Sequence, residues 1–164
     1  MRTRRSFETG HRLKLLVVVD ETPEADRALY FAARRAARIG AGLVMLKVIE
    51  LGETQVFLGV GDIMKAEAEE EAQALLDKAA ARAREIAGVE AEPVMRDGVT
   101  AQELVKLVEE DEDISFLVLA AATEGDGPGP LVSSIATKAG LGLPIPVIIV
   151  PGDLKDAEID ALAG

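Results

Sequence analysis

The sequence contains no cysteine and no tryptophan, and it has a single histidine, His11. Without cysteine the chain forms no disulfide, has no thiol chemistry and offers no thiolate to zinc. One histidine near the N-terminus disfavours histidine-based catalysis or metal binding. Aromatic residues make up 3% of the chain, too few to form a platform on which nucleic-acid bases stack.

Positive charge and long apolar runs are also scarce. The chain has 18 Lys and Arg against 29 Asp and Glu, so its formal net charge is −11. This balance disfavours nucleic acid or an anionic membrane as a general partner. No apolar run reaches the roughly 20 residues of a membrane-spanning helix, and no signal-peptide core follows the N-terminus. We therefore expect a cytoplasmic protein without nucleic-acid or membrane partners.

The sequence does contain enough hydrophobic residues to form a core. Hydrophobic residues make up 49% of its 164 residues, which suits one domain. We expect that domain over residues 13–152. Residues 1–12 carry four arginines and are predicted to form a mobile, solvated basic arm. Residues 153–164 form a tail with a helical stripe, which is either docked or frayed; its members are Leu154, Ala157, Ala161 and Leu162.

The domain alternates between strand-like and helix-like segments. Amphipathic helices are predicted between successive strands. This order predicts an α/β fold: a five-stranded parallel sheet, in the order 3-2-1-4-5, with helices on both faces. The third run is more polar, so we place it at an edge. The strand-like runs are residues 13–20, 43–50, 89–96, 114–122 and 145–150.

Local signals mark the helix ends. Thr22 is predicted to cap the first helix with Pro23 at its first position, and Gly40 to end it. Asp62 is a candidate cap for a helix to residue 87. Thr100 and Glu103 have the spacing of a capping box. A further short helix is predicted over residues 131–139, ended by Gly140.

Two other segments allow more than one interpretation. Residues 51–61 form a predicted loop whose apolar Val56, Phe57 and Leu58 are candidates for a lid over a pocket or for an anchor on the core. The acidic run of the long helix resembles a metal site on paper. Adjacent helical residues point in different directions, so a solvated face is the favoured interpretation. Its members are Glu67, Glu69, Glu70 and Glu71.

The predicted strand order makes strands 1 and 4 neighbours and opens a crevice at their carboxyl ends. Asp20 ends the first strand, and the loop over residues 120–134 follows the fourth, so both face this crevice. A Gly/Pro loop before a helix suits a phosphate. The spacing of its glycines matches neither a P-loop nor the dinucleotide fingerprint, and glycines gather in plain turns as well.

From residue 13 to residue 151 the chain resembles the universal stress protein family, in the strand ending at Asp20, the order of elements and the closing half. Many members bind an adenine nucleotide in this crevice through Gly-x2-Gly-x9-Gly-Ser/Thr after strand 4. Aligned without a gap, the three glycine places fall on Ala120, Thr123 and Ser133, followed by Ser134. None of the three glycines is kept.

The resemblance implies a site for ATP or another adenine nucleotide, with Mg²⁺ only alongside it. Asp20 occupies the place of the acid that accepts from ribose hydroxyls, and Val48 that of the valine whose backbone meets adenine. Lys47 stands where the family often has His. Gly125 and Gly127 are candidates for a differently shaped anion loop, with Pro128 and Pro130 reducing its donors. The remaining expected ligand-binding residues are Ala120, Thr123, Ser133, Ser134 and Ile135.

The resemblance also implies a homodimer through strand 5, Pro146 to Val150, with protein partners unknown. The absent glycines favour an alternative: an interaction module of the same fold that binds no nucleotide. An enzyme is disfavoured, and no base or nucleophile is visible. Residues 20–23 lack the Ser-Gly-Gly-x-Asp-Ser loop of ATP pyrophosphatases. A phosphoacceptor receiver domain would need Lys, not Val150, before Pro151, and Asp97 near Asp20.

Overall fold

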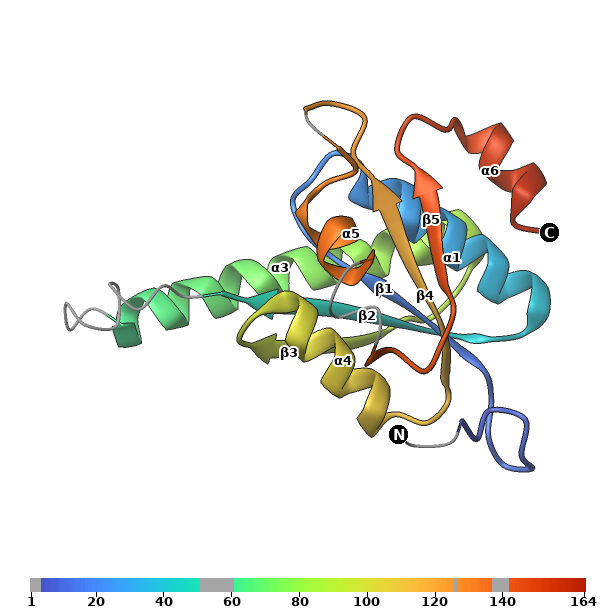
Figure 1. The fold of residues 1–164 in the computed structure, drawn as a ribbon, viewed down its shortest axis with the longest axis horizontal. Helices are drawn as coiled ribbons and strands as arrows, with labels where there is room; N and C mark the ends of the chain where they lie inside the picture. The colour runs from blue at the N-terminus through green and yellow to red at the C-terminus, as the bar shows by residue number, and fades with distance from the viewer. Residues whose placement is uncertain (1–3, 51–60, 126, 137–141) are drawn as a thin grey trace.

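The computed structural model describes residues 4–50, 61–125, 127–136 and 142–164 (Figure 1). The candidate lid at Val56 to Leu58 and the helix end predicted at Gly140 lie outside these residues. The strands are β1 (Lys14–Val18), β2 (Gly42–Ile49), β3 (Glu92–Asp97), β4 (Ile114–Ala121) and β5 (Val147–Pro151). The helices are α1 (Ala25–Ile39), α3 (Gly61–Ala87), α4 (Thr100–Glu110), α5 (Pro130–Ser134) and α6 (Asp156–Leu162).

The five strands form one parallel sheet in the order β3-β2-β1-β4-β5, so the predicted fold and the edge position of β3 are confirmed. β1 lies at the centre, where Leu16 pairs with Val44 of β2 and with Leu117 of β4. All three of these side chains are at most 1% exposed. The near-continuous apolar runs therefore reflect strands covered on both faces.

Alternate residues of β1 define two cores. Leu15 and Val17 pack in one core with α1, α3 and α6, and Leu16 and Val18 pack in the other with α4 and α5. The two cores arise because successive side chains of a strand point to opposite faces of the sheet. The sheet is thus the middle layer between two helical layers (Figure 1).

The helix ends differ from the predicted caps. α1 begins at Ala25, after an N-cap at Glu24 that makes no side-chain capping bond, so the roles predicted for Thr22 and Pro23 are wrong. Asp62 lies inside the first turn of α3 rather than before it. The predicted end of α1 is confirmed, because Gly40 has a left-handed φ of 68° and donates its N–H to Ala36 O.

The capping box predicted for α4 is also wrong. Val99 is the N-cap and makes no side-chain capping bond. The N–H of Thr100 instead donates to Oε1 of Glu50, 2.9 Å away at the end of β2. A carboxylate that follows strand β2 thus meets the positive N-terminal end of this helix. Helix α3, by contrast, buries its predicted stripe and leaves its acidic run exposed; the stripe includes Leu76, Ala79, Ala83 and Ile86.

The tail is docked, but for the most part not through its predicted stripe. Ile159 and Ala163 are fully buried and Leu154 packs against the core, whereas Leu162 is 64% exposed, so the stripe prediction holds only for Leu154. The hydroxyl of Tyr30 on α1 donates to Asp160 Oδ1 at 2.9 Å. Arg38 of α1 also donates to the backbone oxygen of Asp160, at 2.6 Å. α6 therefore lies along α1 (Figure 1).

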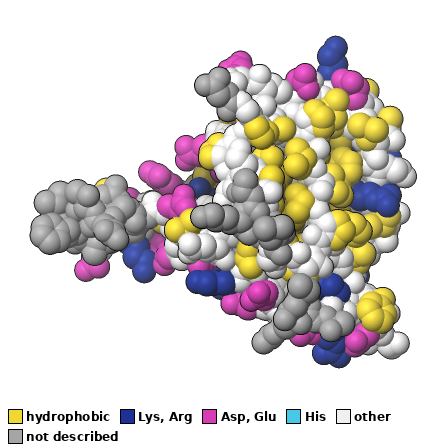
Figure 2. Space-filling view, viewed as in Figure 1, with side chains coloured by type: hydrophobic (Ala, Val, Ile, Leu, Met, Phe, Trp, Pro, Cys, Tyr) yellow, Lys and Arg dark blue, Asp and Glu magenta, His cyan; other side chains and the backbone are white. Residues whose placement is uncertain are grey.

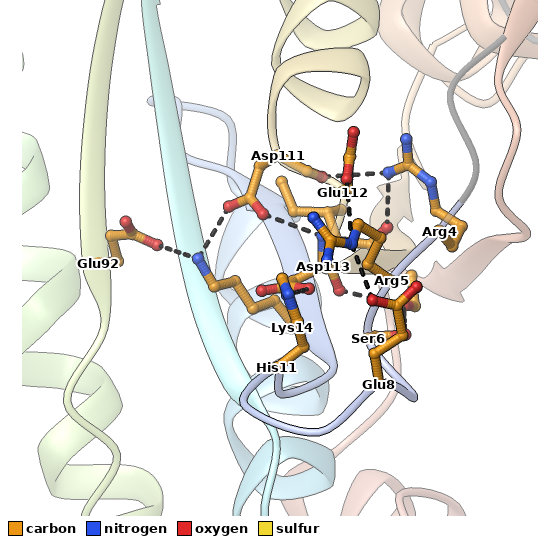
Figure 3. A network of polar contacts seen from close by, with 12 residues as sticks. Arg4, Arg5, Ser6, Glu8, His11, Lys14, Glu92, Asp111, Glu112 and Asp113 are labelled. Carbon is orange, nitrogen blue, oxygen red and sulfur yellow. Dashed lines mark hydrogen bonds and ion pairs between the residues drawn. The ribbon is translucent and has the colours of Figure 1, made fainter.

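The basic arm is also docked, contrary to the prediction of a solvated segment (Figure 3). Arg4 Nη1 donates to three backbone oxygens, of Val108 at 2.7 Å, Ile114 at 3.0 Å and Asp111 at 3.1 Å. His11 Nδ1 lies 2.7 Å from Asp113 Oδ1. Residues 4–12 thus close the amino end of the sheet between α4 and β4. Among the described residues, no helix is both long and apolar enough to cross a membrane.

Candidate functional site

The carboxyl edge of the sheet carries two adjoining cavities. The larger, of about 530 Å³, lies between the ends of β1 and β2 and the start of α4. The smaller, of about 70 Å³, lies between β1, β4 and the loop before α5. Four residues line both cavities and so mark the passage between them: Val18, Asp20, Pro130 and Leu131.

Asp20 follows β1 and is held by its own turn. Its Oδ1 accepts the N–H of Thr22 at 2.9 Å and also the Thr22 hydroxyl. Within the described part of the chain, Oδ2 makes no hydrogen bond. Because α1 begins only at Ala25, Asp20 does not cap that helix. Asp20 instead orders the turn at Thr22 through its Oδ1.

The end of β2 supplies the opposite wall. Val48 and Lys47 line the larger cavity, as does Glu50. Val48 is 5% exposed, so it presents little more than its edge and its backbone. Glu50 is fixed by the Thr100 N–H, which ties the wall to α4. This wall carries one cationic and one anionic side chain.

The structure brings part of the predicted loop to the cavities. Ala120 lines the smaller one and Ser134 the larger one. Ser133 is exposed and its N–H donates to Gly129 O at 3.1 Å. Ile135 is 3% exposed and packs in the core with α4, so its side chain does not reach the site.

The glycines of the loop are placed differently from the prediction. Gly125 and Gly127 are exposed and line neither cavity. Both have a positive φ, 86° and 84°, because the loop turns sharply through open space. Gly129 lines the smaller cavity instead, beside Pro128. The prediction that Gly125 and Gly127 form the anion loop is therefore not supported by their positions.

Thr123 is exposed and lies next to Gly152, outside both cavities. A Cβ on Gly152 would lie 2.3 Å from the backbone oxygen of Ala121 and 2.9 Å from Cβ of Glu24. The end of β5 therefore runs against the end of β4 and the start of α1 with no space for a methyl group. Glu24, whose Cβ lies beside Gly152, also lines the smaller cavity.

A third cavity of about 580 Å³ lies on the other side of Asp20, between α1 and α3. Asp26 crosses it, accepting from Arg82 Nε at 2.9 Å and from Arg27 Nη2 at 2.7 Å. Partial burial opposes ionisation of Asp26, but these hydrogen bonds outweigh it and hold its pKa below the ordinary value. Both carboxylate oxygens of Asp26 are therefore engaged by arginines at this cavity.

Sequence reasoning missed Glu24 and Glu50. Glu50 follows β2 as Asp20 follows β1, and that parallel could have found it. Glu24 lies in the turn before α1, beside Gly152, and lines the smaller cavity. No cluster of three or more potential metal ligands occurs among residues 4–50, 61–125, 127–136 and 142–164.

A doubly wound parallel sheet with a crevice at its switch point defines a class of α/β ligand-binding domains. Within that class, the model of the universal stress protein family matches residues 11–151. The chain belongs to this family. No match was found among curated protein sequences.

Solved structures share the fold. A universal stress family protein from Burkholderia pseudomallei is 26% identical, with a TM-score of 0.63, covering 84% of this chain and 95% of that one. One from Archaeoglobus fulgidus in complex with dAMP is 23% identical, with a TM-score of 0.63, covering 84% and 97%. A universal stress protein in complex with cAMP is 18% identical, with a TM-score of 0.58, covering 86% and 98%.

Proposed function

We propose that this stress-family protein acts by binding, and that the cavity of about 530 Å³ between β1, β2 and α4 takes an adenine nucleotide. One observation carries the proposal: Asp20, Val48 and Ser134, from three separate segments, line one cavity at the switch point of the sheet. Its volume of about 530 Å³ falls within the range of small-molecule sites, roughly 300–1,000 Å³. The dAMP and cAMP complexes of two structural neighbours agree with this ligand class.

Each residue has a role in this proposal. Oδ2 of Asp20 accepts from a ribose hydroxyl while Thr22 holds Oδ1. Val48 lies against the adenine, and Lys47 flanks it. Ser134 and the backbone near Ala120 meet the phosphate end. Mg²⁺ enters only with a bound nucleotide.

The test is calorimetric titration of the full chain with AMP and with ATP, each with and without Mg²⁺. Asp20→Asn keeps the acceptor for Thr22 but removes the carboxylate, so we expect at least a tenfold loss of affinity. Ser134→Ala should weaken binding of the phosphorylated ligands. Asp153→Asn makes the same chemical change at an exposed position outside the cavities and should leave affinity unchanged. Saturable binding that survives Asp20→Asn undiminished would contradict the site.

We further propose a homodimer through β5. The sheet ends at β5, and Ile149 on it is 46% exposed. Figure 2 shows hydrophobic side chains gathered on the face that includes this edge. An exposed apolar edge strand favours pairing with a second copy. A lysine at Ile149 should therefore give a monomer in sedimentation equilibrium. Ile39→Lys, at a residue 42% exposed on α1, should not.

A second candidate function has an observation of its own. Gly125 and Gly127 lie away from both cavities, and the family's three glycine places are filled by other residues. This favours a dimeric interaction module without a nucleotide. It predicts flat titrations up to millimolar adenine nucleotide, together with a dimer that Ile149→Lys disrupts.

A further inference from the structure

We propose that Glu24 and Asp20 make this cleft selective by charge: it takes an adenine nucleoside or nucleoside monophosphate and disfavours the triphosphate. The inference rests on the proposed function, because it concerns the ligand class of the same cavity. It goes beyond that function by assigning a specificity role to Glu24.

The residues that line each cavity indicate which part of a bound nucleotide each cavity would hold. Adenine against Val48 and ribose against Asp20 fill the larger cavity. Ser134 also lines the larger cavity and meets the first phosphate there, whereas Asp20 and Pro130 line both cavities, so a longer phosphate chain continues past them into the smaller cavity. That cavity measures about 70 Å³ against about 530 Å³, so most of the ligand must fit in the larger one.

The smaller cavity presents negative charge to this chain. Its lining includes the carboxylates of Asp20 and Glu24, and every charged residue that lines it is acidic. Glu24 is half-buried, and its Cβ lies beside Gly152. Repulsion between like charges grows as solvent is excluded, and each added phosphate adds charge. An uncharged nucleoside escapes this repulsion.

The backbone of the loop before α5 offers few hydrogen-bond donors to offset this repulsion of the phosphates. Pro128 and Pro130 have no N–H. The N–H of Ala122 donates to Pro128 O at 2.9 Å, and that of Ser133 to Gly129 O at 3.1 Å. These groups are thus engaged within the loop. The helix that follows, α5, has five residues, so its dipole is short.

The experiment titrates the full chain with adenosine, AMP and ATP, each with and without Mg²⁺. We expect adenosine and AMP to bind at least tenfold more tightly than ATP. Glu24→Gln should raise the affinity for ATP severalfold and leave that for adenosine unchanged. Glu21→Gln is the matched control, because Glu21 is exposed and lines neither of these two cavities. Added salt should narrow the difference between AMP and ATP by screening the repulsion.

The outcomes separate the two proposals. ATP binding as tightly as AMP would overturn the charge selection alone. ATP becoming the tightest ligand in the presence of Mg²⁺ would also overturn it, because the carboxylates would then hold a metal. An equal gain from Glu24→Gln and Glu21→Gln would remove the assigned role of Glu24. If none of the three compounds binds, the proposed function fails and this inference fails with it.

Discussion

The two ends of the sheet are built in opposite ways. At the amino end, the arm, α4 and β4 are joined through Arg4, and Lys14 Nζ bridges Asp111 at 2.8 Å and Glu92 at 3.2 Å (Figure 3). At the carboxyl end, Asp20 and Lys47 face cavities. Parallel strands deliver their following loops to the carboxyl end, where ligands bind in this class of fold. The difference indicates that side-chain interactions stabilise one end and leave the other open.

Core substitutions at the two ends should show the largest contrast. Ile114 starts β4 beneath the arm and is fully buried, so Ile114→Ala should lower the free energy of unfolding by about 2–4 kcal/mol. Leu131 lies on the cavity wall and is partly buried. Leu131→Ala should cost about 1 kcal/mol, because less apolar surface loses its cover. Urea denaturation measures both, and equal losses would refute the contrast.

Removing the side chain of Arg4 should have the next largest effect. Arg4→Ala removes one hydrogen bond from each of three backbone oxygens, although Asp111 O still accepts the N–H of Ile114, and we expect the free energy of unfolding to fall by about 1–2 kcal/mol in urea denaturation. The loss is limited because Nε and Nη2 of Arg4 are buried without a partner in the described structure. Arg12→Ala, at an exposed residue of the same arm, is the control. Ligand affinity should be unchanged, and a large change in it would mean that the two ends are coupled.

The amino end should lose stability in alkali. Partial burial opposes protonation of Lys14, but its hydrogen bonds to Asp111 and Glu92 outweigh this and raise its pKa above the ordinary 10.5. Its contribution is therefore full below 10.5 and is lost as the pH rises through the folded-state value. In the unmodified protein this loss of unfolding free energy should reach up to about 1 kcal/mol. The Lys14→Met variant should not show it. Parallel alkaline profiles for the two proteins would contradict the prediction.

The pH dependence of stability should be smallest at the carboxyl end of the sheet, where stability is lost in acid and not in alkali. The pKa of Asp26 lies below its ordinary value of 3.8, so its contribution is present above 3.8 and is lost as the pH falls through the folded-state value. The Asp26 side chain is 40% exposed, and solvent screening limits the effect to less than about 1 kcal/mol. Asp26→Asn should flatten the acid side of the stability profile. Asp153→Asn should leave it unchanged.

The fold could be predicted because its signals are periodic and repeated. Apolar runs of strand length alternate with helical stripes, and few topologies accommodate that order. The start of α4 could not be predicted, because the group that meets it is Glu50, which lies 50 residues before Thr100. Local spacing contains no information about such a partner. The docked arm is another such case, since Arg4 binds carbonyls more than 100 residues away.

The candidate site was predictable to the extent that it follows strand ends. Asp20 was placed at the crevice in this way, and Val48, Ala120 and Ser134 by the resemblance to the family. The loop glycines were misplaced because glycine content does not say which way a loop folds. Glu24 was missed because it lies in the turn before α1 and not directly at a strand end. Whether these residues bind a ligand stays a prediction for titration to test.

Gly152 has a consequence for how this protein can change in evolution. Every other amino acid carries a Cβ, and one at this position would overlap the Ala121 carbonyl oxygen. A replacement would therefore have to shift the end of β4 or the start of α1, and both border the smaller cavity. Gly125 and Gly127 face open space, so a side chain there would meet the strain of a positive φ but no atom of a neighbouring segment. We expect descendants of this sequence to change more readily at these two positions than at Gly152.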